Sequence, residues 1–185
     1  MKKAYIHFAE GFEEIEAITV VDVLRRAEIP VVMVSVTENN EVTGSHGITV
    51  YTDVLFEDAD YENADILILP GGQPGTNNLN RHTGLKKVIT EFNNSGRYIA
   101  AICAAPLVLG GLDILKGKKA VCFPGYENQL KGATVLSDPV VVSGNIITGR
   151  GPGVALEFSL RIVSELNGKN IADKLAGSMI VQNWR

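Results

Sequence analysis

The chain has 185 residues, of which 45% are hydrophobic, and its formal net charge is −4 at pH 7. This length and composition predict one domain, residues 1–185, built around a single substantial core. The acidic balance argues against nucleic-acid binding, and the lack of an apolar run approaching ~18 residues argues against a membrane span.

The location and redox environment follow from a few residues. Acidic side chains lie close to the start of the chain, at Glu10, Glu13 and Glu14, which argues against a secretory signal. The two cysteines, Cys103 and Cys122, are too few for a disulfide framework or a metal cluster. We therefore expect a cytoplasmic protein without a metal site or a cofactor.

Strand and helix patterns alternate along the chain. Strands are predicted at 3–8, 31–36, 66–69, 98–102 and 146–148, and helices at 13–27, 85–94, 104–111, 152–166 and 170–178, followed by a tail at 181–185. Residues 42–51, interrupted by Gly44 and Gly47, predict a strand pair that projects from the sheet and could serve in a dimer. The alternation predicts an α/β fold, a three-layer sandwich with a mostly parallel sheet.

The strand predicted at 98–102 leads directly into Cys103, two alanines and Pro106. Because proline favours the first turn of a helix, Cys103 is expected at a sharp strand-to-helix turn, the layout of a nucleophile elbow. Backbone N–H groups and the helix dipole at such a turn would lower the pKa of the thiol. The alternative is a buried structural cysteine.

The strand predicted at 66–69 ends in the sequence PGGQPG, residues 70–75. Since the carboxyl ends of parallel strands meet at one edge of a sheet, Gly71 and Gly72 are expected to face the same crevice as Cys103. Glycine lets backbone N–H groups approach a ligand closely, as an oxyanion hole requires. A plain loop that ends a strand is the alternative.

Glu16 falls on the apolar face of the helix predicted at 13–27. Burial there would raise the pKa of its carboxyl and make it a proton donor or acceptor near neutral pH. The alternative is a first-turn carboxylate that complements the helix dipole, which is the role we expect for Glu13 and Glu14.

Four segments in this order carry a family resemblance: AEGFEEIE at 9–16, LPGG at 69–72, AAICAAP at 100–106 and RGPG at 150–153. The chain resembles the ThiJ/PfpI superfamily along nearly its whole length, and more narrowly the parkinsonism-associated deglycase subfamily. The resemblance implies a flavodoxin-like homodimer with Cys103 as the redox-sensitive nucleophile. It also implies that protonated Glu16 hydrogen-bonds the thiolate, and that Gly72 and Ala104 supply the backbone donors at the oxyanion position.

Two positions depart from the family pattern. The protease and amidotransferase branches have a His partner after the elbow, where this chain has Phe123, and phenylalanine cannot take a proton. We therefore expect no peptidase activity. Close relatives carry an Arg where this chain has His46; His46 is expected to bind substrate near the dimer interface, with a charge that depends on pH.

His7 is expected in the core, His82 at the surface, and Cys122 in the packing of a short apolar strand at 120–123.

Two functions from different classes stay open. In the first, Cys103 adds to a reactive dicarbonyl such as methylglyoxal, and Glu16 shuttles a proton while the adduct becomes a hydroxy acid. The resemblance implies this cofactor-independent glyoxalase or deglycase activity more than the spacing does. In the second, the protein is a redox sensor or chaperone, and oxidation of Cys103 to sulfenic or sulfinic acid alters partner binding without significant turnover.

Overall fold

The computed structural model describes residues 2–182 and 184, and is built on a central seven-stranded sheet with the order β10-β11-β7-β6-β1-β2-β5. Its strands are β1 (Ala4–Phe8), β2 (Val31–Ser35), β5 (Val54–Leu55), β6 (Ile66–Leu69), β7 (Tyr98–Ile102), β10 (Val140–Ser143) and β11 (Ile146–Gly149). Neighbouring strands are parallel except for the antiparallel pair β10–β11. The predicted, mostly parallel sheet is confirmed.

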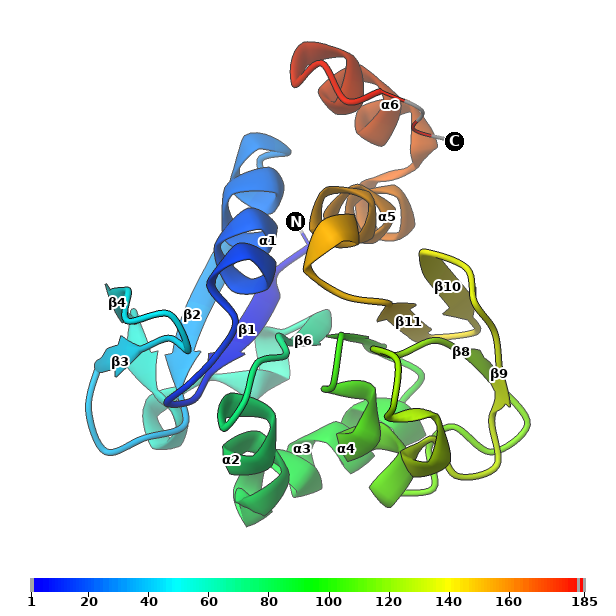
Figure 1. Cartoon of the computed structure of the whole chain (residues 1–185). Helices are drawn as coiled ribbons and strands as arrows, with labels where there is room; N and C mark the ends of the chain where they lie inside the picture. Colours follow the sequence, from blue (N-terminus) through cyan, green and yellow to red (C-terminus); the bar gives the residue numbers. More distant parts are fainter. Residues whose placement is uncertain (1, 183, 185) are drawn as a thin grey trace.

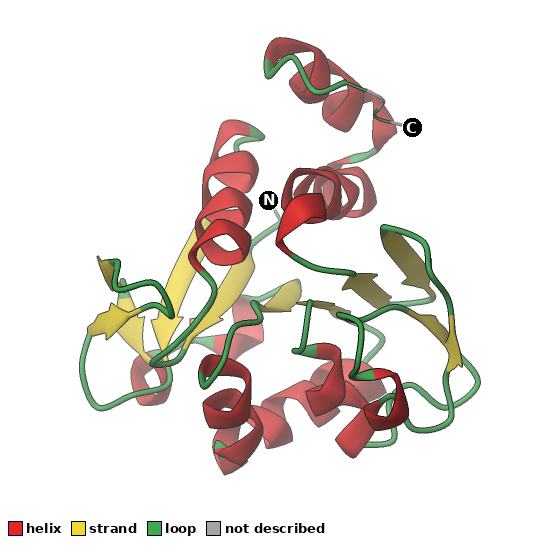
Figure 2. Cartoon of the chain, in the orientation of Figure 1, coloured by secondary structure: helices red, strands yellow, loops and turns green. Residues whose placement is uncertain are grey.

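Helices cover both faces of the sheet and make three layers (Figures 1 and 2). One face carries α1 (Glu14–Arg26), α5 (Ala155–Asn167) and α6 (Lys169–Ser178), and the other carries α2 (Gly75–Arg81), α3 (Thr83–Asn94) and α4 (Pro106–Gly111). Single 3-10 turns lie at Phe56–Asp58, Tyr61–Asn63, Glu127–Gln129 and Pro152–Val154. Among the described residues, no helix is both long and apolar enough to cross a membrane.

Two small sheets stand apart from the central one. The antiparallel pair β3 (Glu41–Thr43) and β4 (Thr49–Tyr51) is the strand pair predicted at 42–51. The parallel pair β8 (Lys119–Ala120) and β9 (Thr134–Val135) lies near β10 at the other end of the molecule (Figure 1).

The core is divided by the sheet into two halves. Along β6, Ile66 and Ile68 pack with α1 and α5, whereas Leu67 and Leu69 pack with α2, α3 and α4. Side chains alternate between faces along a strand, so a strand that is covered on both sides needs apolar residues at every position. This explains the unbroken apolar runs at the central strands.

Several predicted elements need correction. The helix predicted from 104 begins at Pro106, because Ala104 and Ala105 belong to the turn after Cys103. The strand predicted at 120–123 ends at Ala120, and Cys122 lies in irregular backbone. The short helix α2 and the strands β5 and β10 were not predicted, since α2 is polar and the strands lie at sheet edges. Of the predicted tail at 181–185, residues 183 and 185 lie outside the described part.

Candidate active site

Cys103 lies between β7 and α4 in a left-handed backbone conformation, with φ of 65°. This conformation is uncommon for residues other than glycine. Backbone hydrogen bonds on both sides hold the turn: Cys103 N donates to Gly149 O at 2.9 Å, and Cys103 O accepts from Phe123 N at 2.8 Å. The predicted nucleophile elbow is therefore present, and its half-buried side chain lines a cavity of about 640 Å³.

Glu16 is fully buried beneath the elbow, on the inner face of α1. Its Oε2 accepts a hydrogen bond from Gly71 N at 2.7 Å, and the carboxyl also interacts with the side chain of Cys103. Burial raises the pKa of Glu16 to about 7, and the hydrogen bonds from Gly71 and Cys103 oppose that rise. A carboxyl with this pKa can both give and take a proton near neutral pH.

Close approach explains the two glycines after β6. A Cβ on Gly71 would lie 2.6 Å from Cys103 Cβ and 2.7 Å from Glu16 Oε2. Gly72 has a φ of 90°, and a Cβ there would collide with the backbone N of Glu13. The two N–H groups have separate partners, because Gly71 donates to Glu16 while Gly72, together with Ala104, donates to the Cys103 sulfur.

The structure contradicts the prediction of a lowered pKa for Cys103. Burial first, and then the charge of Glu16, raise the pKa of the thiol to about 12, although the N–H groups of Ala104 and Gly72 lower it. The N–H groups of the turn favour a thiolate, but burial of the sulfur and the carboxylate beside it outweigh them. When Glu16 holds the proton its charge disappears, so the pair accommodates one negative charge at a time.

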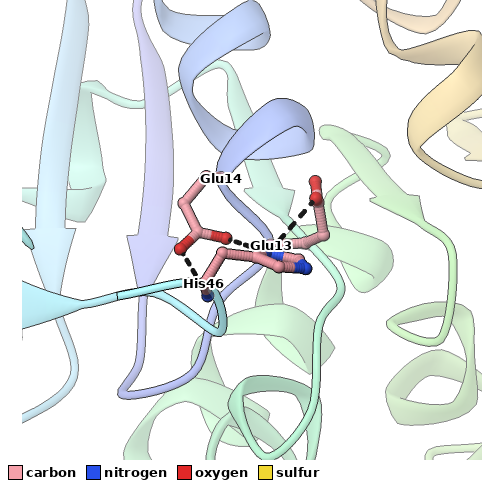
Figure 3. A group of neighbouring side chains, drawn as sticks. All are labelled: Glu13, Glu14 and His46. Carbon is pink, nitrogen blue, oxygen red and sulfur yellow. Dashed lines mark hydrogen bonds and ion pairs between the residues drawn. The ribbon is translucent and has the colours of Figure 1, made fainter. Parts of the chain in front are cut away.

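His46 lies in the turn between β3 and β4 and lines the same cavity as Cys103. Its Nδ1 is 2.8 Å from Glu14 Oε2, and its backbone N donates to Glu14 Oε1 at 2.7 Å (Figure 3). Glu14 also accepts from Ser45 Oγ at 3.3 Å and Ile48 N at 3.4 Å, so it clamps the hairpin onto α1. Glu14 therefore does more than complement the helix dipole, which was the role expected for it: it also holds the hairpin against α1.

The Glu14–His46 contact moves the pKa values of both groups. Burial alone would raise the pKa of Glu14, but the hydrogen bonds from His46 lower it overall. The same hydrogen bond and the negative charge of Glu14 raise the pKa of His46. Glu13 caps α1 instead: its Oε2 accepts from Glu16 N at 2.7 Å.

Glu13, Glu14 and His46 also place three possible metal-ligand atoms within 4.8 Å of one another (Figure 3). Hydrogen bonds to the hairpin already engage both oxygens of Glu14, and the N-cap engages one oxygen of Glu13. These contacts account for the arrangement, so we assign no metal to it.

Comparisons with known proteins identify the family. A sequence model of the DJ-1/PfpI family matches residues 2–165. The chain belongs to the DJ-1/PfpI family. This confirms the resemblance to the ThiJ/PfpI superfamily, and the solved structure of oxidized Toxoplasma gondii DJ-1 confirms the flavodoxin-like fold. That structure superposes with a TM-score of 0.94 at 34% identity, covering 98% of this chain and 100% of the other.

Two curated relatives illustrate the range of lengths in the DJ-1/PfpI family. Protein DJ-1 homolog B of Arabidopsis thaliana is 38% identical over 183 residues, which are 98% of this chain but 42% of the relative. This chain therefore spans less than half of that protein. Glutathione-independent glyoxalase DJR-1.2 of Caenorhabditis elegans is 34% identical over 168 residues, covering 90% of this chain and 89% of the relative.

Other side chains of this DJ-1/PfpI cavity come from loops and were not found from the sequence. Ile15, Ile48, Phe123 and Pro152 form an apolar part of its wall, and Gln73 also lines it. Gln73 Nε2 donates to Tyr126 Oη at 3.1 Å, which ties the β6–α2 loop to the segment after Phe123. Nothing in the local sequence marks these residues, because only the fold brings their loops together.

The remaining candidates lie away from the cavity. His7 is buried as predicted, with Nε2 3.0 Å from Tyr61 Oη, and burial lowers its pKa to about 4. His82 was expected at the surface, but it is half-buried and its Nδ1 accepts from Leu85 N at 3.0 Å to cap α3. Cys122 is buried in the core half beneath the sheet, in keeping with the predicted packing role.

Proposed function

We propose that the protein is a cysteine-dependent, cofactor-independent glyoxalase or deglycase that acts on methylglyoxal or its adducts and serves the response to oxidative stress in the cytoplasm. One observation carries this proposal: the Cys103 sulfur receives the N–H groups of Gly72 and Ala104 and lies beside a buried carboxyl whose pKa is about 7. The glyoxalase name of the Caenorhabditis elegans relative supports it.

Addition of the thiol to the aldehyde starts the reaction. The Cys103 sulfur forms a bond to the aldehyde carbon, C1, while the thiol proton passes to the Glu16 carboxylate. The carbonyl oxygen gains the negative charge, and the N–H groups of Gly72 and Ala104 stabilise it. Glu16 then returns the proton to that oxygen, giving a neutral hemithioacetal. This sequence needs no free thiolate beforehand, which agrees with the raised pKa of Cys103.

Isomerisation and hydrolysis complete the turnover. One proton moves from C1 to the neighbouring carbon, C2, and another moves from the C1 oxygen to the C2 oxygen. C1 is thereby oxidised to a thioester and C2 is reduced to an alcohol, without an external electron acceptor. Water then adds to C1, the C–S bond breaks, and lactate leaves with the Cys103 thiol restored.

Release of lactate from methylglyoxal without glutathione tests the proposal. Wild-type protein should produce lactate, and Cys103→Ser should lose the activity because a serine hydroxyl is far less nucleophilic than a thiol at this site. Cys122→Ser is the matched control and should keep the wild-type rate, since Cys122 lies outside the cavity. Lactate production by Cys103→Ser at the wild-type rate would contradict the assignment.

A second function, redox sensing, has support of its own. The side chain of Cys103 opens to the cavity, whereas Cys122 is only 4% exposed. The same N–H groups that would stabilise a reaction oxyanion can stabilise the oxygens of a sulfinic acid at Cys103. A protein that is oxidised at Cys103 and releases no lactate would be a redox sensor or chaperone in place of an enzyme.

We also propose that the protein forms a homodimer through the outer face of α1. Ile15, Ile18, Ile48 and Leu156 are large apolar residues that remain exposed on this face. All four line a groove of about 510 Å³ that adjoins the Cys103 cavity. An exposed apolar face of this kind is typical of a protein–protein contact.

A further inference from the structure

His46 is the imidazole that shares a cavity with Cys103. The chain contains three histidines, all of them in the described part. His7 is fully buried against Tyr61, and His82 caps α3, so neither lines the cavity. The side chain of His46 does line it, and this side chain is 70% exposed, which makes the ring accessible to solvent and to a bound substrate.

Glu14 fixes which nitrogen of the ring is free. Nδ1 lies 2.8 Å from Glu14 Oε2, and a carboxylate there accepts a hydrogen bond, so Nδ1 carries the proton. The other nitrogen, Nε2, points away from Glu14 (Figure 3) and has no hydrogen-bond partner among the described residues. In the neutral ring Nε2 is therefore the basic atom. A carboxylate that orients an imidazole in this way is the arrangement that enzymes use to activate nucleophiles.

The two proton-transfer groups of the site differ in access to water. Glu16 is fully buried and faces the sulfur from inside the protein, where its oxygen is held by Gly71 N. His46 lines the cavity, and its side chain is 70% exposed. A water molecule in the cavity can therefore contact the imidazole, whereas Glu16 has no solvent-accessible surface.

We propose that His46 is the general base that activates water to hydrolyse the Cys103 thioester, and that Glu14 is the residue that positions it. This inference rests on the proposed function, because it assigns the last step of that reaction. The water oxygen forms a bond to C1 as its proton passes to His46 Nε2. The C–S bond then breaks, and its electron pair stays on sulfur. The imidazolium gives up its proton, which reaches the sulfur through the departing acid or through solvent and restores the thiol.

The charged groups around the imidazole favour this role. Glu14 faces Nδ1, and Glu13 Oε1 lies 4.0 Å from the same atom; both come from the start of α1. Across the cavity the titratable group is Cys103, with Glu16 behind it. The imidazolium that forms when water gives up its proton is thus stabilised by two carboxylates that face Nδ1, the nitrogen that does not take the proton.

Trapping of the acyl-enzyme tests the inference. Wild type, His46→Gln and His46→Arg are each mixed with methylglyoxal, quenched in acid, desalted and treated with hydroxylamine, which converts a thioester to lactohydroxamate. Both variants should hold close to one lactyl group per chain, because they isomerise the adduct but cannot activate water, and lactate release should fall roughly a hundredfold or more. His46→Arg keeps a cation beside Glu14, so it separates a loss of base from a loss of structure.

Two further variants complete the test. His82→Asn removes an imidazole outside the cavity and should behave as wild type. Glu14→Gln should move the pH at which lactyl hydrolysis reaches half its maximum to lower pH, because the hydrogen bond to the Glu14 carboxylate and its negative charge raise the pKa of His46.

Each outcome decides the question. Wild-type rates in His46→Gln and His46→Arg would overturn the inference, and so would slow lactate release without trapped lactyl groups. Absence of lactate from the wild type would overturn the proposed function as well. Lactate from the wild type with no acyl-enzyme in the variants would overturn the role of His46 alone.

Discussion

Burial of Glu16 makes the stability of the fold depend on pH. Its pKa is about 7 in the folded protein, compared with an ordinary value of 4.5, so folding favours the protonated carboxyl. The stabilisation of the protonated form is complete below pH 4.5 and is lost as the pH rises through 7. The difference corresponds to roughly 3 kcal/mol of unfolding free energy.

Urea denaturation at pH 5 and pH 8 measures this dependence. Between these values wild type should lose more unfolding free energy than Glu16→Gln, because glutamine cannot ionise. Glu38→Gln, at an exposed position, should follow the wild type. Equal pH dependence in wild type and Glu16→Gln would show that the carboxyl is not protonated in the folded protein.

In the lactate assay Glu16→Gln should lose roughly a hundredfold in turnover, since glutamine keeps the shape of Glu16 but cannot carry the proton.

Access to solvent, more than acidity, separates the two cysteines. Burial raises the pKa of both thiols, to about 12 for Cys103 and about 11 for Cys122. Only the Cys103 side chain lines the cavity, so dilute peroxide should oxidise Cys103 well before Cys122. Mass spectrometry of the two peptides over time measures the order. Oxidation of both cysteines at the same rate would mean that the cavity gives Cys103 no advantage.

The loop after β6 and the turn after β7 fit together with no room for a side chain at Gly71. Gly71→Ala places a Cβ 2.6 Å from Cys103 Cβ, so the loop must move away from the elbow. We expect a loss of about 1–3 kcal/mol in stability and a large loss of turnover, because the hydrogen bond from Gly71 N to Glu16 stretches as well.

Gly153→Ala is the control for that change. Gly153 lies in the turn before α5, where an added Cβ meets nothing within 4 Å. Its urea midpoint and lactate rate should match those of wild type. A Gly71→Ala protein with wild-type stability and turnover would show that the loop has more freedom than the close contacts indicate.

The elements with strong local signals were predictable, and those defined by tertiary contacts were not. The central strands were found because burial on both faces demands an unbroken apolar run, and the elbow because Pro106 marks the start of α4. Glu16 was found because a carboxyl interrupts an apolar helical face. The clamp between Glu14 and His46 joins residues 32 positions apart, and the raised pKa of Cys103 depends on its burial, so neither has a local signature.

In the molecule as a whole, one helix, α1, contributes both to the Cys103 site and to the proposed dimer contact. The inner face of α1 carries Glu16 to the sulfur, the first turn holds the β3–β4 hairpin through Glu14, and the outer face exposes Ile15 and Ile18. Ile15 and Ile48 line both the cavity and the neighbouring groove. A partner on this face would therefore cover apolar surface and narrow the opening of the cavity at the same time.

Substitution of Ile18 tests the dimer without touching the cavity. Ile18 lines the groove but not the cavity, and it is 39% exposed. Ile18→Glu places a charge where a partner would have to desolvate it, a cost of several kcal/mol that a dimer contact cannot recover without a matching cation. Light scattering after gel filtration should therefore give the mass of two chains for wild type and of one chain for Ile18→Glu.

Ile171→Glu, at a 41% exposed position on α6, is the matched control and should stay dimeric. A dimeric Ile18→Glu protein would move the interface to another face, and a monomeric wild type would leave the groove without a second copy to cover it.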